Sequence, residues 1–356
     1  MMRVIFLTHS SDQGHRFRVE QYFPTLRDHG IDPRWQPFSG TLGERLALYR
    51  ELPSYDVVCV QRRLFSLFEF HRIRRQSKKI LFDLDDAIMY RSSSSFVPYS
   101  LSRWVKFRWM VRGSDVVTVG NQFLKEEVLK ASGEKEVVLI PTCIDTSLYP
   151  KRKTISDSGE FILGWIGTKG NLHYLKQLEP VFRAIRQRFS HVRLKIVSND
   201  FIESPSLPVV KKPWRLEDEN DDLISFDVGL MPLGNDLWSK GKCGLKIIQY
   251  LSVGVPAVCT PVGINRDIVK DGQNGFWAST PSEWVSRLSR LIEDADLRQR
   301  MGFCGMETVE KEYSLPVTSE KVLRVLQTLA GKASDVVEQE HRGSSPTHPS
   351  SLGGGG

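Results

Sequence analysis

Short apolar runs alternate with longer amphipathic segments along most of the chain, and this alternation restricts the fold more than any other feature. In the first half, strand-like runs occur at 3–8, 55–60, 79–84, 115–120 and 136–141, with helical patterns at 16–29, 64–76, 100–112 and 121–131. Single strands that alternate with helices are typical of a parallel, doubly wound sheet. Residues 1–140 are therefore predicted to form a Rossmann-like α/β domain.

A polar stretch over 141–160, which holds two prolines and little periodicity, is predicted to be a linker. The rhythm then restarts, with strand-like runs at 161–167, 192–198, 209–213, 227–233, 256–260 and 275–279 and helical patterns at 172–189, 216–225, 244–253, 281–293, 296–312 and 315–330. We expect a second Rossmann-like domain over 161–312 that faces the first across a cleft, then a helix over 313–330. Residues 331–356 are rich in Gly, Ser and Pro, which predicts a disordered tail.

The chain's composition limits the functional classes without choosing among them. Its 356 residues carry a formal net charge of +7, which suits an anionic small molecule, a membrane surface or nucleic acid. The five cysteines are scattered, which favours reduced thiols over a disulfide framework or a zinc site. Without a signal peptide or a membrane-spanning run in the sequence, we expect a cytoplasmic protein.

Two segments of the second half are arranged as a phosphate site would be. The stretch GWIGTKGN, with Gly167, Thr168, Lys169 and Gly170, is a glycine-rich turn between a strand and a helix, which can bring backbone N–H groups close to a phosphate. Lys242 and Lys246 flank the start of the helix predicted at 244–253. A cation at that positive end is unfavourable unless an anion binds there. The alternatives are an ordinary turn and solvated lysines.

The run KCGLKIIQYLSVGVPAVCTPVGINRDIVKDGQNGFWA (242–278) resembles the nucleotide-sugar-binding half of family 4-type glycosyltransferases with the GT-B fold. That family shows a Glu-x7-Glu motif, then A-x-G-x-P-V-V-A and G-G-x-x-E-x-V-x-D-G-x-N-G. The resemblance is specific over 161–312 and looser before 140. The two glutamates fall on Gly241 and Gln249, so the chain resembles a branch without the pair.

The resemblance implies a nucleotide diphospho-sugar donor, a retaining reaction, and neither a metal nor another cofactor. It places the donor near Gly167–Gly170, Lys246, Gln249 and the loop that carries Gly263 and Asn265. Gln249 can hydrogen-bond a ribose hydroxyl, because an amide both donates and accepts.

In the first half, the loop after the first strand carries Gly14, Arg16 and Arg18. Gly14 permits a tight turn, and an arginine fork suits a diphosphate. The alternative is that these arginines are solvated helix residues.

Three carboxylates, Asp83, Asp85 and Asp86, close the strand predicted at 79–84. Asp83 and Asp85 form a D-x-D pattern, the metal motif of the GT-A fold, but so short a pattern is common by chance. We interpret Asp85 or Asp86 as the group that orients or deprotonates an acceptor hydroxyl. The alternative is that the cluster caps the following segment.

Two basic segments contain interleaved aromatic residues. Residues 62–79 have seven Arg or Lys against one Glu, and residues 102–113 have four cations, no acid and two tryptophans. This pattern suits peripheral contact with an anionic membrane, at the inner membrane face, and hence a lipid-linked acceptor. No motif supports nucleic acid. The alternative is that the aromatics are core residues and the cations a solvated face.

The sequence therefore predicts transfer of a sugar from a nucleotide diphospho-sugar to a hydroxyl acceptor in polysaccharide or glycolipid assembly. A nucleotide-sugar epimerase on the same fold and a non-catalytic nucleotide-sugar-binding homologue remain alternatives.

Overall fold

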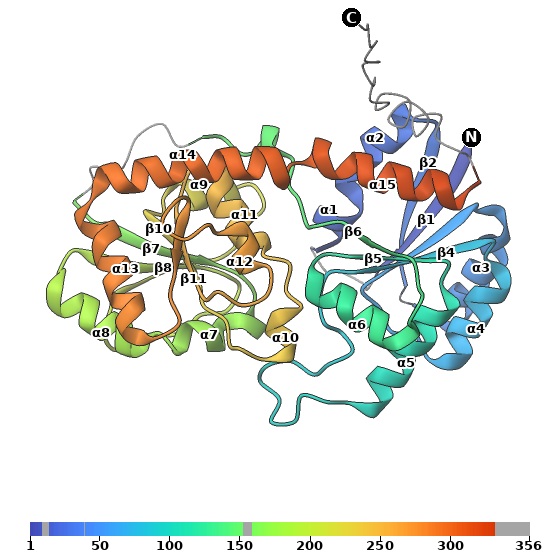
Figure 1. The fold of residues 1–356 in the computed structure, drawn as a ribbon, viewed down its shortest axis with the longest axis horizontal. Coiled ribbons are helices and arrows are strands. Elements are labelled where there is room, and N and C mark those ends of the chain that lie inside the picture. Colours follow the sequence, from blue (N-terminus) through green and yellow to red (C-terminus); the bar gives the residue numbers. More distant parts are fainter. Residues whose placement is uncertain (9–13, 39, 152–158, 332–356) are drawn as a thin grey trace, which may run out of the picture.

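Two parallel β-sheets organise the fold (Figure 1). The computed structural model describes residues 1–8, 14–38, 40–151 and 159–331. The first sheet contains β1 (Met2–Thr8), β2 (Ile31–Pro37), β3 (Val57–Gln61), β4 (Lys79–Leu84), β5 (Val116–Val119) and β6 (Val137–Leu139). The second contains β7 (Phe161–Ile166), β8 (Val192–Val197), β9 (Val209–Lys212), β10 (Val228–Met231), β11 (Ala257–Cys259) and β12 (Gly275–Trp277). The α/β fold class predicted from the sequence is confirmed.

Helices connect the strands of each sheet. Those of the first domain are α1 (Gly14–Arg18), α2 (Phe23–Asp28), α3 (Leu42–Glu51), α4 (Leu67–Gln76), α5 (Leu101–Gly113) and α6 (Gln122–Ser132). The second domain has α7 (Leu172–Lys176), α8 (Glu179–Arg188), α9 (Glu219–Ile224), α10 (Leu237–Lys240), α11 (Leu245–Ser252), α12 (Asn265–Ile268), α13 (Pro281–Glu293) and α14 (Ala295–Glu312). The last helix is α15 (Leu315–Leu329).

The strand orders locate the loops where a ligand is expected. The first sheet runs β2-β1-β3-β4-β5-β6 and the second β12-β11-β10-β7-β8-β9. In doubly wound sheets, ligands bind beyond the carboxyl ends of the strands at the point where the order reverses. That point lies between β1 and β3 in the first sheet and between β7 and β10 in the second. The loop after β7 is the glycine-rich turn that contains Gly167 and Gly170.

Alternate residues of the first sheet pack into two cores, because successive side chains of a strand point to opposite faces. Ile5, Val58 and Phe82 pack with α3 to α6 on one face. Val4 and Cys59 pack on the other face with residues of α15.

The helix α15 therefore completes the core of the first domain, although it follows the second domain in sequence. Its buried residues Leu323, Val325, Leu326 and Leu329 join Met2, Val4 and Phe6 of β1 in one cluster. Figure 1 shows α14 and α15 running one after the other along the same side of both domains. The domain limits predicted from the sequence stay a prediction. The tail predicted over 331–356 lies, apart from Gly331, outside the described residues.

The structure can be compared with the sequence predictions on cysteines and on membrane-spanning segments. All five cysteines are free, and four of them are buried. Within the described part of the chain, no helix combines the length and apolar character needed to cross a bilayer.

Candidate functional site

Lys246 and the glycine-rich turn after β7 lie against each other. The first turn of α11 begins after Gly244, whose φ of +70° and close approach to Ile268 exclude other residues there without strain. A Cβ added to Gly167 would lie 2.7 Å from Cε of Lys246 and 2.8 Å from the ring of Trp165. The Nζ of Lys246 lies 5.7 Å from the centre of that ring. The structure thus brings together two features that the sequence singled out separately.

The ammonium of Lys246 is held in an environment that disfavours its charge. Burial lowers its pKa to about 7, the neighbouring Lys242 adds to the effect, and Asp86 opposes it. At neutral pH the group is therefore poised between its two states. A bound anion would favour the charged state and raise the pKa again.

Asp85 and Asp86 lie just beyond β4, beside Arg62. The Oδ1 atom of Asp85 accepts a hydrogen bond from Gln61 Nε2 at 3.0 Å and lies 3.6 Å from Arg62 Nε. Arg62 Nη1 lies 3.0 Å from Asp86 Oδ2. Burial raises the pKa of Asp85, Arg62 opposes that shift, and Asp86 adds to it. A carboxylate with a raised pKa is the better general base near neutral pH.

Asp86 also connects the two domains, because its Oδ1 lies 3.8 Å from Nζ of Lys242. Asn121, at the start of α6, donates hydrogen bonds to the carbonyls of Lys240 (3.2 Å) and Lys242 (2.9 Å). A Cβ on Gly241 would lie 2.4 Å from that of Ala87. The position of the first missing glutamate is therefore packed against the first domain.

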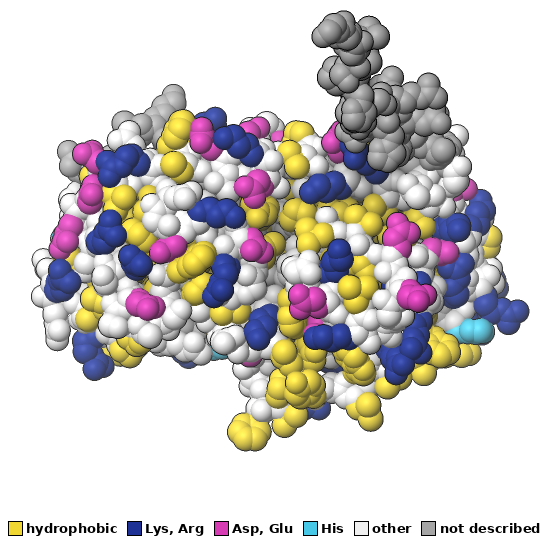
Figure 2. All heavy atoms as spheres, in the orientation of Figure 1, with side chains coloured by type: hydrophobic (Ala, Val, Ile, Leu, Met, Phe, Trp, Pro, Cys, Tyr) yellow, Lys and Arg dark blue, Asp and Glu magenta, His cyan; other side chains and the backbone are white. Residues whose placement is uncertain are grey.

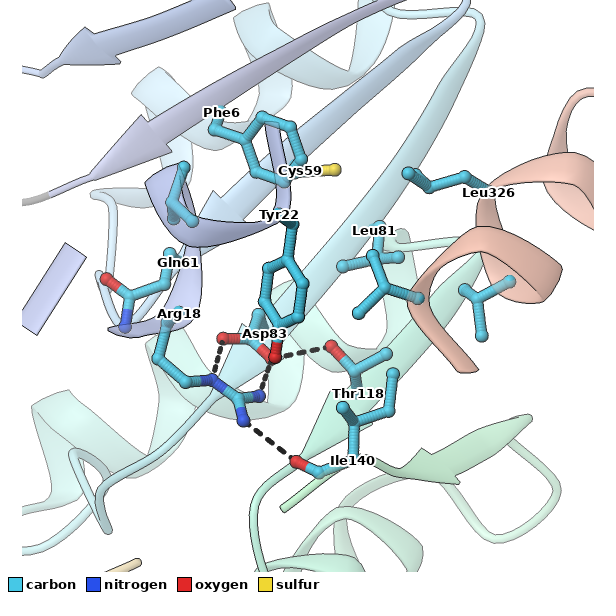
Figure 3. A pocket seen from close by; sticks show the side chains of 13 residues that line it. Phe6, Arg18, Tyr22, Cys59, Gln61, Leu81, Asp83, Thr118, Ile140 and Leu326 are labelled. Carbon is cyan, nitrogen blue, oxygen red and sulfur yellow. Dashed lines mark hydrogen bonds and ion pairs between the residues drawn. The ribbon is translucent and has the colours of Figure 1, made fainter. Parts of the chain in front are cut away.

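Arg18 and Asp83 form a buried pair within the first domain (Figure 3). Arg18 Nε lies 3.1 Å from Asp83 Oδ2, and its Nη2 contacts the other carboxylate oxygen. Arg18 Nη1 also donates to the carbonyl of Ile140 at 2.8 Å, and Thr118 donates to Asp83 at 2.7 Å. The cavity beside them, closed in part by Leu326, has a volume of about 30 Å³, the space of roughly one water molecule. It admits neither a sugar nor a nucleotide, so Arg18 borders no space of the donor's size here, and its predicted donor role stays a prediction.

Arg16 instead reaches the second domain. Its Nη2 lies 2.5 Å from Oε1 of Glu219, the first residue of α9. The hydroxyl of Tyr149 donates to the same oxygen at 3.2 Å, and Gln249 Nε2 lies 3.4 Å from that hydroxyl. Gly14, which begins α1, lies on the same short helix as Arg16. Neither Tyr149 nor Glu219 was singled out from the sequence, because neither belongs to a recognisable local motif.

The remaining residues of the glycine-rich turn are more open. Thr168 accepts a hydrogen bond from Asn171, and the exposed Lys169 pairs with Asp200 at 3.0 Å. A Cβ on Gly170 would meet no heavy atom within 4 Å. The turn therefore has space beside Gly170, whereas Gly167 is enclosed.

Gly263 and Asn265 form the loop into α12. Gly263 has a φ of +54°, and a Cβ there would lie 2.6 Å from the carbonyl oxygen of Lys240. Asn265 is fully buried and donates to the carbonyl of Thr260 at 3.0 Å, while its Oδ1 has no hydrogen-bond partner among the described residues. The described ranges also contain no group of three or more His, Cys, Asp or Glu residues that could hold a metal ion.

Comparison with known proteins agrees with this architecture. Residues 161–294 match the family model described as "Glycosyl transferases group 1". A similar characterised protein is N-acetyl-alpha-D-glucosaminyl L-malate synthase of Bacillus anthracis, which is 22% identical over 247 residues, covering 65% of this chain. The match spans 62% of the length of that relative.

Two solved structures share the fold over nearly the whole chain. Anabaena HepE in complex with UDP and glucose has a TM-score of 0.70 and 16% identity, and covers 92% of this chain and 100% of its own. Sucrose-phosphate synthase of Thermosynechococcus elongatus has a TM-score of 0.71 and 14% identity, and covers 94% and 100%. The chain therefore has the two-domain GT-B fold, and residues 161–294 of its second domain match the model of the glycosyl transferases group 1.

Proposed function

We propose that this protein is a glycosyltransferase that moves a sugar from a nucleotide diphospho-sugar to a hydroxyl acceptor. The observation that carries the proposal is the contact between Lys246 and Gly167 at the strand-order reversal of the second sheet. A buried lysine with a lowered pKa, placed beside a glycine-rich turn, is suited to bind an anionic group. The negative charge of that group would stabilise the ammonium form of the lysine.

In this proposal the diphosphate lies along Gly167–Gly170, beside Lys246 and Lys242. Gln249 is then available to the ribose, and Tyr149 orients its amide. Anabaena HepE has been solved with UDP-glucose, which makes uridine nucleotides the first donors to test.

The departing diphosphate develops negative charge as the bond to the sugar breaks. Lys246 and Lys242 stabilise that charge electrostatically, so we propose a reaction that needs no metal and, as in the family that the sequence resembles, retains the anomeric configuration. Asp83 of the D-x-D pattern is already engaged by Arg18.

On the acceptor side, Asp85 or Asp86 orients or deprotonates the attacking hydroxyl. The raised pKa of Asp85 suits a base, while Asp86 lies nearer the donor lysines. Contact between the domains would exclude water and limit hydrolysis of the donor. We propose that the reaction belongs to polysaccharide or glycolipid assembly on the cytoplasmic side of a membrane.

Thermal shift measurements with UDP, GDP and their sugar conjugates test the donor site, with and without a chelator. We expect a shift that the chelator does not change and that Lys246→Ala largely abolishes. Lys311→Ala is the matched control, because Lys311 is exposed on α14, where its Nζ lies 3.8 Å from Glu307 Oε2. If no nucleotide shifts the unfolding temperature of the wild type, the proposal fails.

A nucleotide-sugar-binding protein without activity is the second candidate. The observation that favours it is the close packing of Gly241 against Ala87, which leaves no carboxylate at the first motif position. Incubation with a nucleotide sugar distinguishes the two: a transferase slowly hydrolyses its donor or glycosylates an added acceptor, whereas a binding protein returns the donor unchanged.

A further inference from the structure

The segment between β4 and α5 projects from the first domain and exposes large apolar side chains. Phe96 is fully exposed, Tyr99 is 64% exposed and Leu101 is 80% exposed. Figure 2 shows a hydrophobic cluster with basic side chains beside it on the projection at the lower edge of the molecule, where Figure 1 places this segment and α5. Isolated apolar residues are common on surfaces, but a projecting cluster of them indicates an interaction site.

The exposed cluster continues along one face of α5. Leu101, Val105 and Trp109 are spaced four residues apart, so they lie on the same side of the helix, and all three are exposed. The opposite side of α5 is already committed to the core through Phe107, Met110 and Val111. The helix is therefore apolar on a second face that its own domain does not use.

Basic residues accompany this apolar face, and no acid does. Residues 91–113 contain five Arg or Lys and neither Asp nor Glu. Lys106 and Arg108 have no ion-pair partner among the described residues. On the neighbouring α4, the guanidinium of Arg72 lies 4.8 Å from the ring centre of Phe68, which is also exposed. We name the surface formed by Phe96, Val97, Tyr99, Leu101, Val105 and Trp109 the apolar projection.

The base of the projection is fixed beside the candidate site. The segment leaves β4 through Asp85 and Asp86, and Ser93 then contacts the second domain. Its hydroxyl donates to Asp236 Oδ1 at 2.9 Å and lies 3.3 Å from the hydroxyl of Ser239. One segment, between β4 and α5, therefore carries both features. It begins at Asp85 and Asp86, the candidate bases, and continues outward into the apolar projection.

We propose that the apolar projection docks on an anionic lipid bilayer and that a lipid-linked acceptor reaches Asp85 and Asp86 from that surface. The proposal rests on the proposed transferase function and specifies its acceptor. Aromatic side chains enter the interfacial region of a bilayer, and the cations around them attract acidic head groups. A second copy of the chain fits less well, because it would bring the same unpaired cations face to face.

Co-sedimentation with lipid vesicles tests the docking. We expect the protein to bind vesicles of equal parts phosphatidylcholine and phosphatidylglycerol at low salt, and to bind pure phosphatidylcholine much more weakly. The triple variant Phe96→Ser, Leu101→Ser, Trp109→Ser should bind at least about tenfold more weakly. The double variant Lys106→Gln, Arg108→Gln should lose about fivefold for each cation removed.

Matched controls keep the result specific. Phe303→Ser removes an exposed aromatic side chain from α14 of the second domain and should leave vesicle binding unchanged. All variants should keep the wild-type unfolding temperature, because the substituted side chains are not in the core. Light scattering without lipid should show a monomer; association that the triple variant abolishes would instead assign the surface to a second copy.

The outcomes separate this inference from the proposed function. If the wild type ignores the acidic vesicles but still binds nucleotide sugars, the docking proposal is wrong and the transferase proposal stands. If the protein binds vesicles and the triple variant binds equally well, another surface is responsible and the docking proposal also fails. The triple variant should bind nucleotide as the wild type does, which a general loss of folding would not allow.

Discussion

Lys246 is the residue whose chemistry is most altered by its surroundings. Its pKa of about 7, against an ordinary value of 10.5, means that the side chain is mostly neutral at pH 8 in the free protein. A bound diphosphate favours the ammonium form and raises the pKa, so binding at pH 8 should take up close to one proton. At pH 6 the lysine is already charged, and the uptake should vanish.

Calorimetry in buffers of different ionisation enthalpy measures this proton uptake. A nucleotide sugar is the suitable ligand, because its diphosphate carries no proton near neutral pH. Affinity should fall as the pH rises above about 7, since each binding event must then capture a proton. Lys246→Met should bind weakly and without uptake; equal uptake in that variant would show that another group titrates.

The buried pair of Arg18 and Asp83 leads to a second prediction about single residues. Arg18→Met leaves the buried carboxylate of Asp83 without its cation, which should destabilise the protein by about 3–5 kcal/mol. Arg34→Met, which breaks the half-exposed pair with Glu51, should cost less than about 1 kcal/mol. Urea unfolding monitored by circular dichroism compares them. Unchanged stability in Arg18→Met, together with lost nucleotide affinity, would contradict this prediction and support the donor role that the sequence predicts for Arg18.

The two arginines illustrate how far residues can be interpreted from sequence. Both follow the first strand, and both are compatible with a diphosphate. Their difference depends on residues far away in the chain: Asp83 lies opposite Arg18, and Glu219 opposite Arg16. Local spacing contains no information on such partners. The position of Lys246 in the first turn of a helix, in contrast, could be predicted because the start of a helix is a local feature.

At the scale of elements, the glycine-rich turn offers a matched pair of substitutions. Gly167→Ala places a Cβ 2.8 Å from the buried ring of Trp165, and this overpacking should cost about 1–3 kcal/mol and weaken nucleotide binding. Gly170→Ala meets no atom within 4 Å and should be nearly neutral for stability. Thermal unfolding and nucleotide titration of both variants check this. Equal effects would mean that the enclosure of Gly167 is unimportant.

Most strands and helices could be predicted because their apolar periodicity is strong, but β2 and α3 were missed. β2 contains Pro33 and Pro37, which are unfavourable within a central strand and are accepted here because β2 is at the sheet edge. α3 has weak amphipathicity, yet its Thr41–Glu44 capping box is a sequence signal that could have located its start. The helix expected over 172–189 is divided into α7 and α8, with Pro180 at the beginning of α8.

At the scale of the whole molecule, contacts between the domains hold the described arrangement. Arg16 and Glu219 form an ion pair of 2.5 Å across the interface, and Lys242 and Asp86 lie 3.8 Å apart across it. Glu219→Gln should weaken the charge-assisted contact with Arg16 by about 1.5–3 kcal/mol. It should thereby increase the fraction of molecules in which the two domains have moved apart. Small-angle X-ray scattering should then give a larger radius of gyration. Glu203→Gln, at an exposed pair within the second domain, is the control; an equal change there would contradict the prediction.

The return of α15 to the first domain has a consequence for how the protein is made. A ribosome releases β1 before the second domain and α15 after it, so the apolar surface around Val4 and Phe6 lacks its cover while the second domain is being synthesised. Translation therefore cannot finish the two domains in the order in which they are encoded. Until α15 is made, the first domain would expose an apolar surface that chaperones can bind. Its folding would be completed only when α15 docks, after the second domain has been synthesised.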